Sequence, residues 1–171
     1  GRLRIIGQAL EQDAGAAAEL LRRLDVGGSS ELRVALVEAL PRTRGPWHEQ
    51  ALERMAAEQD ATVRRMWVAI MARADPAVAV RGMALGLADN DAAVRTEAAL
   101  VAGSLPAAAV RAGGFPMLLG DRLKDSAAEV RAGAARSLGI LGFAEMFDQI
   151  GPLLSDADAN VRLQALRALG R

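Results

Sequence analysis

Five arginine residues recur along the chain of 171 residues at nearly equal intervals, each directly after a valine or a leucine. They are Arg33, Arg64, Arg95, Arg131 and Arg162, so the intervals are 31, 31, 36 and 31 residues. A guanidinium group presents a planar fork of N–H donors that fits a phosphate or a carboxylate. One interpretation of this arginine column is therefore a basic stripe that binds phosphates. Its regular spacing also indicates a repeated structural unit.

Residues suited to catalysis or metal binding are few and isolated. His48 is the only histidine, and the chain has no cysteine, so His48 lacks the partners of a metal site or a catalytic triad. Asp156 and Asp158 resemble half of a calcium-binding loop, but no residues supply the remaining ligands. Gly113-Gly114 lacks the context of a phosphate-binding loop. We therefore expect no enzyme activity, no cofactor and no metal site.

The elements that position the arginines are predicted to be helices. Counted from each valine or leucine, positions +4, +5, +7 and +8 are mostly apolar or small and form one stripe on a helix. Three residues before each pair stand side chains that cap helix N-termini, namely Ser29, Asp60, Asp91 and Asp158. The fourth unit has Ala127 there, with Asp125-Ser126 upstream, so its helix is expected to begin one residue earlier. Small residues at +9 should end each helix or admit a close neighbour, namely Ala72, Gly103, Gly139 and Gly170.

A second amphipathic segment precedes each of these helices. The segments are about 13–24, 47–58, 76–88, 116–124 and 143–154. Pro76 and Pro116 suit a first helical turn, whereas Pro152 falls late in its segment and predicts a kink or a late start. The chain has no tyrosine and no sustained strand alternation. The predicted unit is a helical hairpin, present as a partial repeat 1–12 and as repeats 13–42, 43–74, 75–105, 106–142 and 143–171.

Two places depart from the regular pattern. The interval of 36 residues maps to five extra residues within 106–116, which must bulge from the stack or add a short helical turn. We expect a neutral surface loop, so that deletion of 109–113 leaves the fold intact. Trp67 stands where an alanine is usual in the buried stripe. We expect Trp67 to fill the core, and the alternative is an apolar anchor on a binding face.

The repeated pattern Asp-x-x-Val-Arg-x-x-Ala-Ala-x-Ala-Leu-Gly resembles that of the HEAT-repeat family, in the short form seen in phycobilisome-lyase-like repeats. Segments 89–103, 125–139 and 156–170 carry the resemblance most clearly. It implies an all-α fold, a right-handed α-solenoid of stacked antiparallel helical hairpins that forms a HEAT-like superhelix. It also implies that each arginine of the column bonds to an aspartate of an adjacent interhelical turn. The expected acidic partners are Asp60, Asp91 and Asp158, and the arginines are Arg33, Arg64, Arg95, Arg131 and Arg162. We call these pairs a structural ladder, and we prefer this interpretation to the phosphate-binding stripe.

The same resemblance implies that the second helix of each hairpin lines the concave side of the molecule. Residues at +2, +3, +6 and +10 point away from the buried stripe and are candidates for partner binding. The residues selected from them are Arg65, Met66, Arg73, Leu100, Arg136, Ile140 and Arg167. The face is mixed apolar and basic, and it becomes more basic toward the C-terminal end. It would suit an extended peptide or a protein ridge with acidic spots.

Composition narrows the classes of function. Twenty-one basic residues balance 21 acidic residues, so no overall field attracts nucleic acid or a membrane surface. The absence of cysteine excludes disulfides and thiolate chemistry. No apolar run reaches the roughly 20 residues that span a bilayer, and no signal-peptide pattern is present. Lys124 is the only lysine, which suggests a GC-rich, bacterial genome, and we expect a cytoplasmic protein.

The predicted function is that of a non-enzymatic protein–protein interaction scaffold. Its partner would be a protein or peptide, or another domain of the same protein. Because neither end of the chain has the polar face of a capping repeat, we expect the chain to be part of a longer protein. One alternative, suggested by the resemblance alone, is a lyase-like or chaperone subunit that acts on a chromophore protein or an enzyme. A second alternative is a nucleic-acid-binding helical repeat module, which the neutral charge and the lack of tyrosine make unlikely.

Overall fold

The structure is a computed structural model that describes residues 15–43 and 46–170. Within these ranges every regular element is a helix and no strand occurs. The α-helices are α2 (Ala16–Val26), α3 (Ser30–Ala39), α4 (His48–Ala57), α5 (Ala61–Met71), α6 (Pro76–Leu87), α7 (Ala92–Ala102), α8 (Ala107–Ala112), α9 (Phe115–Arg122), α10 (Ala128–Leu141), α11 (Phe147–Ile150) and α12 (Ala159–Leu169). The 3-10 helices are η1 (Leu40–Arg42), η2 (Ala144–Met146) and η3 (Gly151–Ser155). The expected partial repeat 1–12 lies outside the described residues.

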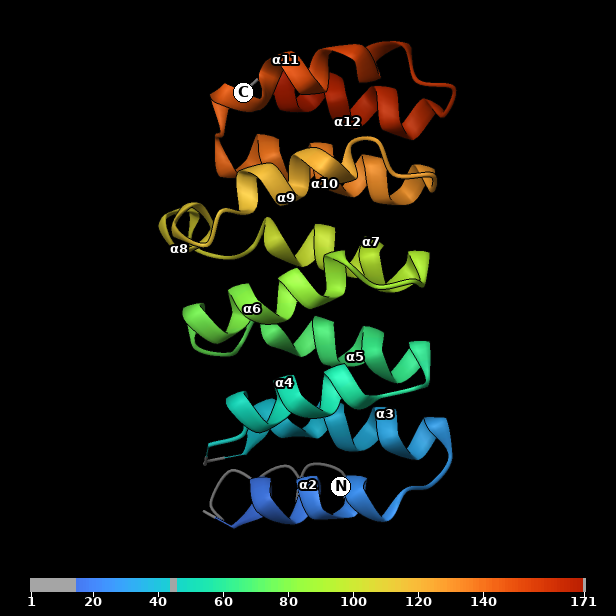
Figure 1. Cartoon of the computed structure of the whole chain (residues 1–171), viewed down its shortest axis with the longest axis vertical. Coiled ribbons are helices and arrows are strands. Elements are labelled where there is room, and N and C mark those ends of the chain that lie inside the picture. The colour runs from blue at the N-terminus through green and yellow to red at the C-terminus, as the bar shows by residue number, and fades with distance from the viewer. Residues whose placement is uncertain (1–14, 44–45, 171) are drawn as a thin grey trace, which may run out of the picture.

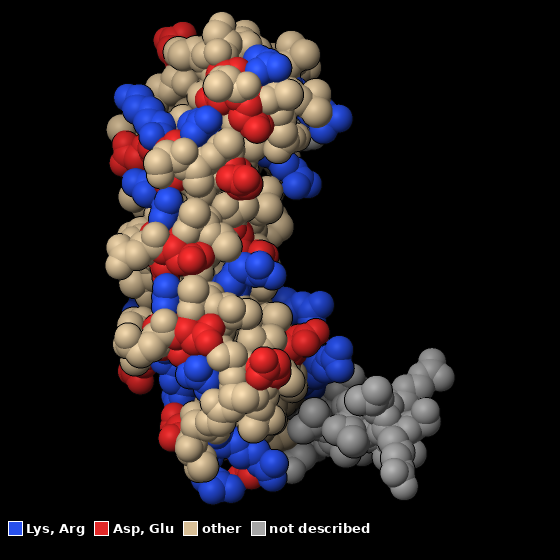
Figure 2. Space-filling view, turned by 90° about the vertical axis from the view of Figure 1, so that its right-hand side faces the viewer, with Lys and Arg blue, Asp and Glu red and all other residues tan. Residues whose placement is uncertain are grey.

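The helices stack as antiparallel hairpins from one end of the molecule to the other (Figure 1). Helices α3, α5, α7, α10 and α12 form one layer, in which α5 packs against α3 and α7, and α10 packs against α7 and α12. The outer layer contains α4, α6 and α9, with α6 against both α4 and α9. Figure 2 shows that the side of the molecule where the inner layer lies is hollowed midway. The predicted α-solenoid is therefore confirmed.

The predicted N-terminal caps position the inner helices. The side chains of Asp60, Asp91 and Asp158 each accept two backbone N–H groups of the first helical turn, and Ser29 accepts one. The expected early start of α10 was wrong, because α10 begins at Ala128 with Ala127 as its cap residue. The Asp125 carboxylate accepts the Ala127 N–H at 3.0 Å, so it orders the preceding turn instead of starting the helix.

Small residues let the inner helices approach closely. A Cβ atom added to Gly139 would lie 2.6 Å from the Cα of Ala168, and one added to Gly103 would lie 2.6 Å from Ser137 Oγ. Ser137 is itself fully buried, and its hydroxyl donates to the Ala99 carbonyl at 2.5 Å. Because a larger side chain would separate the helices at these places, alanine, glycine and serine set the spacing of the inner layer.

The valines of the repeat and Trp67 occupy the core between the two layers. The repeat valines are 0% exposed, namely Val63, Val94, Val130 and Val161. Trp67 is 1% exposed. Trp67 therefore fills the core, as expected, and the alternative of a surface anchor is wrong. A buried indole of this size contributes a large part of the packing energy of its repeat.

The outer layer is irregular in the two C-terminal hairpins. The segment predicted as a helix at 143–154 is divided into η2, α11 and η3, with Pro152 in the first turn of η3. The extra residues near 106–116 form the short helix α8, one of the two expected outcomes. However, Val110 is fully buried, and a Cβ added to Gly113 would lie 2.4 Å from Val80. The expectation of a neutral surface loop was therefore wrong, because this segment is packed on α6.

Candidate functional site

The arginine column forms ion pairs that join each repeat to the next. Arg95 donates through Nε and Nη2 to the two carboxylate oxygens of Asp125, at 2.8 and 2.9 Å. The same two-bond pairing joins Arg64 to Asp89 and Arg131 to Asp156. The Arg95 and Asp125 side chains are only 12% and 4% exposed. We call this series of paired arginines the arginine ladder, and Figure 2 shows Arg side chains interleaved with Asp and Glu along the edge of the stack.

Every arginine of the column except Arg33 also holds the turn of its own repeat. Arg95 Nη1 donates to the backbone carbonyls of Asp89 and Asn90, both at 2.9 Å. Arg64, Arg131 and Arg162 make the same pair of bonds to the carbonyls five and six residues before them. Because one guanidinium contacts two successive turns, the ladder fixes both the shape of each turn and the register between neighbouring repeats.

Two of the three acidic partners named from the sequence, Asp91 and Asp158, were wrong in position. Asp91 and Asp158 cap helices, and the arginines pair with the carboxylates two residues earlier, at Asp89 and Asp156. Asp60 lies 3.8 Å from Arg33, whose shorter contact is to Glu58 at 2.7 Å. A capping carboxylate turns toward its own helix, so the residue two places earlier is the one that faces the neighbouring repeat. The repeated Asp-x-Asp spacing before α7 and α12 is the sequence signal that carries this division of roles.

The first step of the ladder is less regular than the others. Arg33 contacts both Glu58 oxygens through Nη1 alone, at 2.7 and 2.9 Å. Its Nε is buried and has no hydrogen-bond partner among the described residues. At the last step, Arg162 keeps the bonds to its own turn but has no carboxylate partner in the described part of the chain.

Pairing changes the proton affinity of the ladder groups. Hydrogen bonds from Arg95 lower the pKa of Asp125 below its ordinary value, and burial opposes this only in part. Arg131 lowers the pKa of Asp156 in the same way. The carboxylates in turn raise the pKa of both arginines. Because their donors are committed to carboxylates and carbonyls, these arginines do not offer a stripe for phosphates.

The residues predicted to bind a partner do not gather into one place. Four of them are exposed arginines, namely Arg65, Arg73, Arg136 and Arg167. Two are apolar and partly exposed, Leu100 at 38% and Ile140 at 41%. Met66 is half-buried against the core. Arg65 lies 3.8 Å from Glu97, so its charge is partly compensated. Arg136 and Arg167 have no ion-pair or hydrogen-bond partner among the described residues. The unpaired positive charge of the predicted set is therefore strongest on α10 and α12.

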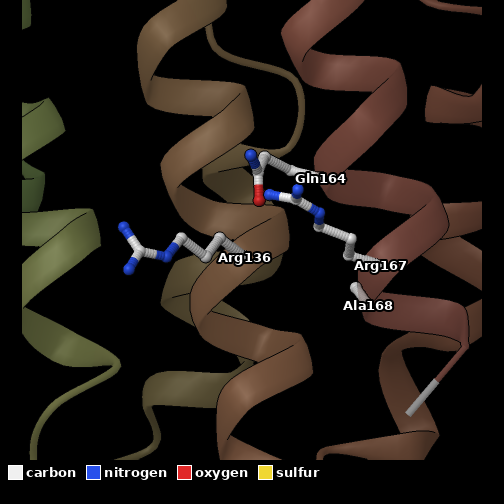
Figure 3. A pocket seen from close by; sticks show the side chains of 4 residues that line it. All are labelled: Arg136, Gln164, Arg167 and Ala168. Carbon is white, nitrogen blue, oxygen red and sulfur yellow. The ribbon is translucent and has the colours of Figure 1, made fainter.

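Two neighbouring hollows lie at this C-terminal part of the inner layer. One, of about 420 Å³, is lined by Arg136, Gln164, Arg167 and Ala168 (Figure 3). The other, of about 350 Å³, spans three helices and is lined by Thr96, Leu100, Glu129, Ala132, Gly133, Arg136, Asn160 and Gln164. Since Arg136 and Gln164 line both, the hollows adjoin. Sequence reasoning missed Glu129, Ala132, Gly133 and Asn160, although the small pair at 132–133 stands where other repeats carry longer side chains.

Metal-binding clusters are absent from the described residues. No group of three or more His, Asp or Glu side chains there could hold a metal ion. His48 accepts the Asp75 N–H at 3.4 Å and lies edge-on to Trp47, so it joins the starts of α4 and α6. None of the helices in 15–43 and 46–170 combines the length and apolar character of a membrane span.

Comparisons with known proteins agree with this architecture. The family model of HEAT repeats matches residues 116–171. No curated protein matches the chain in sequence. A chain from the complex of CpcE and CpcF of phycocyanin lyase from Nostoc sp. PCC7120 is similar with a TM-score of 0.69 and 19% identity, over 92% of this chain and 99% of that chain.

Two solved structures of designed or engineered proteins are also similar. An engineered protein matches with a TM-score of 0.67 and 20% identity, over 96% of this chain and 84% of that chain. A designed armadillo repeat protein in complex with the peptide (KR)4 matches with a TM-score of 0.64 and 18% identity, over 98% of this chain and 90% of that chain. At these identities the likeness concerns the fold. Residues 116–171 are therefore similar in sequence to HEAT repeats, and the described part of the chain has the fold of an α-solenoid.

Proposed function

We propose that this protein is a non-enzymatic scaffold that binds a partner protein or peptide through the concave face of its inner helices. The observation that carries the proposal is the contrast between two sets of arginines. The ladder arginines Arg64, Arg95 and Arg131 are paired with carboxylates, whereas Arg136 and Arg167 are exposed, unpaired within the described residues, and beside hollows. A guanidinium held over a concave surface can bind an acidic side chain of a partner through two hydrogen bonds.

The similar structures support a binding role for this fold. One of them is a designed armadillo repeat protein in complex with a peptide, and another is a subunit complex, that of CpcE and CpcF. Both place a helical solenoid against a second polypeptide. A fold alone does not determine a partner, so the proposal depends on the residues of α10 and α12.

A lyase-like or chaperone subunit is the second candidate, and the likeness to a phycocyanin lyase complex favours it. In that role the protein would act together with a partner chain, as a subunit of a complex. Purification with the native partner, followed by an assay of chromophore transfer, separates the two candidates. A scaffold retains its partner without supporting the transfer.

The pairing of the ladder arginines argues against nucleic-acid binding. The basic column that could have followed a phosphate backbone is engaged in the arginine ladder, where Arg64, Arg95 and Arg131 are 12–18% exposed. The net charge is zero, whereas nonspecific binding of nucleic acid depends on an excess of basic residues.

Site-specific photo-crosslinking tests the proposed face. A benzoylphenylalanine replaces Leu100 on inner helix α7 or, as a matched control, Leu85 on outer helix α6; the two side chains are 38% and 43% exposed. In an extract of the native host, one partner should crosslink from position 100 and not from position 85. The double variant Arg136→Glu/Arg167→Glu should abolish that crosslink, whereas Lys124→Glu should leave it. Crosslinking that is equal at both positions, or stronger at 85, contradicts the proposal.

A further inference from the structure

We infer that the partner is an extended acidic peptide segment, with one apolar side chain inserted between α7, α10 and α12 and neighbouring carboxylates bound by Arg136 and Arg167. The inference rests on the proposed function and specifies its ligand. Its basis is the hollow of about 350 Å³ that these three helices share, which we call the α10 hollow.

The floor of the α10 hollow consists of a pair of residues smaller than the pair at the same positions of any other repeat, although the first repeat also has an alanine, Ala35, at the second of them. Ala132 and Gly133 stand at +2 and +3 of their helix, and Ala132 is 4% exposed. The same positions in the neighbouring repeats hold longer side chains, namely Arg65 and Met66, Thr96 and Glu97, and Leu163 and Gln164. A Cβ added to Gly133 would lie 3.2 Å from the Ala99 Cβ, so α10 lies close to α7 at the floor. The depression is therefore specific to the fourth repeat.

The walls of the hollow combine an apolar side with a pair of amides. Leu100 of α7 forms the apolar wall. On α12, Gln164 Nε2 donates to Asn160 Oδ1 at 3.1 Å, which leaves Asn160 Nδ2 as a donor and Gln164 Oε1 as an acceptor. A peptide backbone needs one acceptor for its N–H and one donor for its C=O. The wall on α12 therefore suits an extended main chain, and the wall on α7 suits its side chain.

Charge defines the sequence that the hollow favours. In Figure 3, Arg136 points from α10 away from α12, and Arg167 lies beside Gln164. Arg136 lines the α10 hollow, and Arg167 lines the hollow that adjoins it. Glu129 lies seven residues before Arg136 and thus about 10 Å away along the helix axis. The Glu129 carboxylate repels acidic groups from that end and directs them toward Arg136. A segment with an apolar residue between acidic residues fits this arrangement, which is opposite in charge to the (KR)4 peptide of the similar designed protein.

A nucleic-acid strand fits less well than a peptide. It would carry phosphates past Glu97 and Glu129, both of which lie on the same face as Arg136. The described inner face also offers no tyrosine or tryptophan on its surface for base stacking, because Trp67 is buried in the core.

Fluorescence anisotropy with three labelled peptides tests the inference. The probes are (Asp-Leu)4, the charge-reversed (Arg-Leu)4 and the apolar-deleted (Asp-Ser)4. We expect (Asp-Leu)4 to bind at least about tenfold more tightly than either control, which corresponds to about 1.4 kcal/mol. Tighter or equal binding of (Arg-Leu)4 overturns the inference, as does equal binding of (Asp-Ser)4. Absence of binding by all three peptides also overturns it.

Two variants locate the binding on the α10 hollow. Ala132→Leu fills the floor and should be tolerated by the fold, because the next repeat carries Leu163 at the same position. Arg136→Glu reverses the charge at one rim. Each should weaken (Asp-Leu)4 binding at least about tenfold, whereas Lys124→Glu, with the same change of net charge, should alter it by less than about twofold. Circular dichroism melting checks that each variant is folded.

The result of the variants separates this inference from the proposed function. If (Asp-Leu)4 binds equally to the parent protein and to folded Ala132→Leu, the α10 hollow is not the site. A partner that still crosslinks from position 100 would then preserve the scaffold proposal and overturn only its ligand assignment. Absence of a crosslink from the concave face overturns both. A labelled oligothymidine that displaces (Asp-Leu)4 and binds more tightly would assign the face to nucleic acid instead.

Discussion

A single arginine of the ladder performs two tasks at once. Arg95 binds the two carbonyls of its own turn and both oxygens of Asp125 in the next repeat. Asp125 Oδ1, which accepts from Arg95 Nη2, also accepts the Ala127 N–H. Because the pair is largely shielded from water, the cost of desolvating the two charges offsets much of their attraction. The direction of the bonds therefore contributes more to the choice of register than their net energy contributes to stability. The ladder therefore acts mainly to select one stacking register.

Removal of one member of this pair should be costly. Arg95→Ala leaves the Asp125 carboxylate, 4% exposed, with only the more distant Arg122, at 3.7 Å, as a charged partner. We expect a loss of about 2–4 kcal/mol in the free energy of unfolding, measured by urea denaturation. The double variant Arg95→Ala/Asp125→Ala should lose less than the sum of the two single variants, because the second change removes the stranded charge. Additive losses, or an unchanged midpoint for Arg95→Ala, would show that the pair does not stabilise the stack.

The lowered pKa of Asp125 predicts a contribution to acid sensitivity. A carboxyl with a pKa below its unfolded value of about 3.9 stabilises the fold above that pH and loses this contribution as pH falls through the folded value. The parent protein should therefore lose stability more steeply below about pH 4 than Asp125→Asn. Urea midpoints measured between pH 7 and pH 2 check this. Parallel pH profiles for the two proteins would contradict the expectation.

The irregular first step of the ladder predicts a stabilising substitution. Glu58→Asp shortens the side chain by one methylene and should allow Arg33 to adopt the two-bond pairing that satisfies its buried Nε. We expect a gain of about 0.5–1 kcal/mol in unfolding free energy. The matched reverse change, Asp89→Glu, should lose a similar amount at the second step. If both substitutions change stability in the same direction, the length of the acid is not what distinguishes the two steps.

At the scale of the helices, α8 shows how an insertion became part of the core. Deletion of 109–113 removes Val110, which is fully buried, and is expected to lower stability by about 2 kcal/mol. Thermal melting measures the loss. The control Ala108→Ser changes an exposed residue of the same helix and should remain within about 0.5 kcal/mol of the parent. A deletion variant as stable as the parent would restore the original expectation of a neutral loop.

Helix identity and capping could be predicted from the sequence because both depend on local pattern. Asp60, Asp91 and Asp158 precede an apolar stripe of helical period, and they cap helices as expected. The ladder partners could not be assigned as reliably, since two acids two residues apart compete and only the geometry of the turn decides between them. The packing of Val110 depends on its distance from α6, a tertiary contact that no local pattern records.

The α10 hollow also could not be predicted by listing the exposed positions of each repeat. Arg136 and Leu100 were predicted as exposed members of the inner face, but the hollow that they line exists because Ala132 and Gly133 have such small side chains. A search for functional side chains passes over such small residues. Comparison of the same position across repeats would have found them, because Leu163 and Arg65 occupy the position of Ala132.

The whole molecule is a stack in which each hairpin buries the apolar side of its neighbour. Such solenoids gain their stability from interfaces between adjacent repeats, and their extended inner face is available for binding. The small residues of the inner layer set the separation of successive inner helices, and the ladder sets their register. The concave face proposed to bind an acidic segment exists only if this stacking extends through all five hairpins.

A distance between the first and last repeats tests the stacking most directly. The chain has no cysteine, so Glu38→Cys on α3 and Arg167→Cys on α12 place two spin labels at equivalent positions of the inner face. Four steps at about 8–10 Å between packed helices predict a separation of about 32–40 Å by double electron–electron resonance. A single population in that range supports the open stack. A distance below about 25 Å, as in a globule whose ends meet, would contradict it.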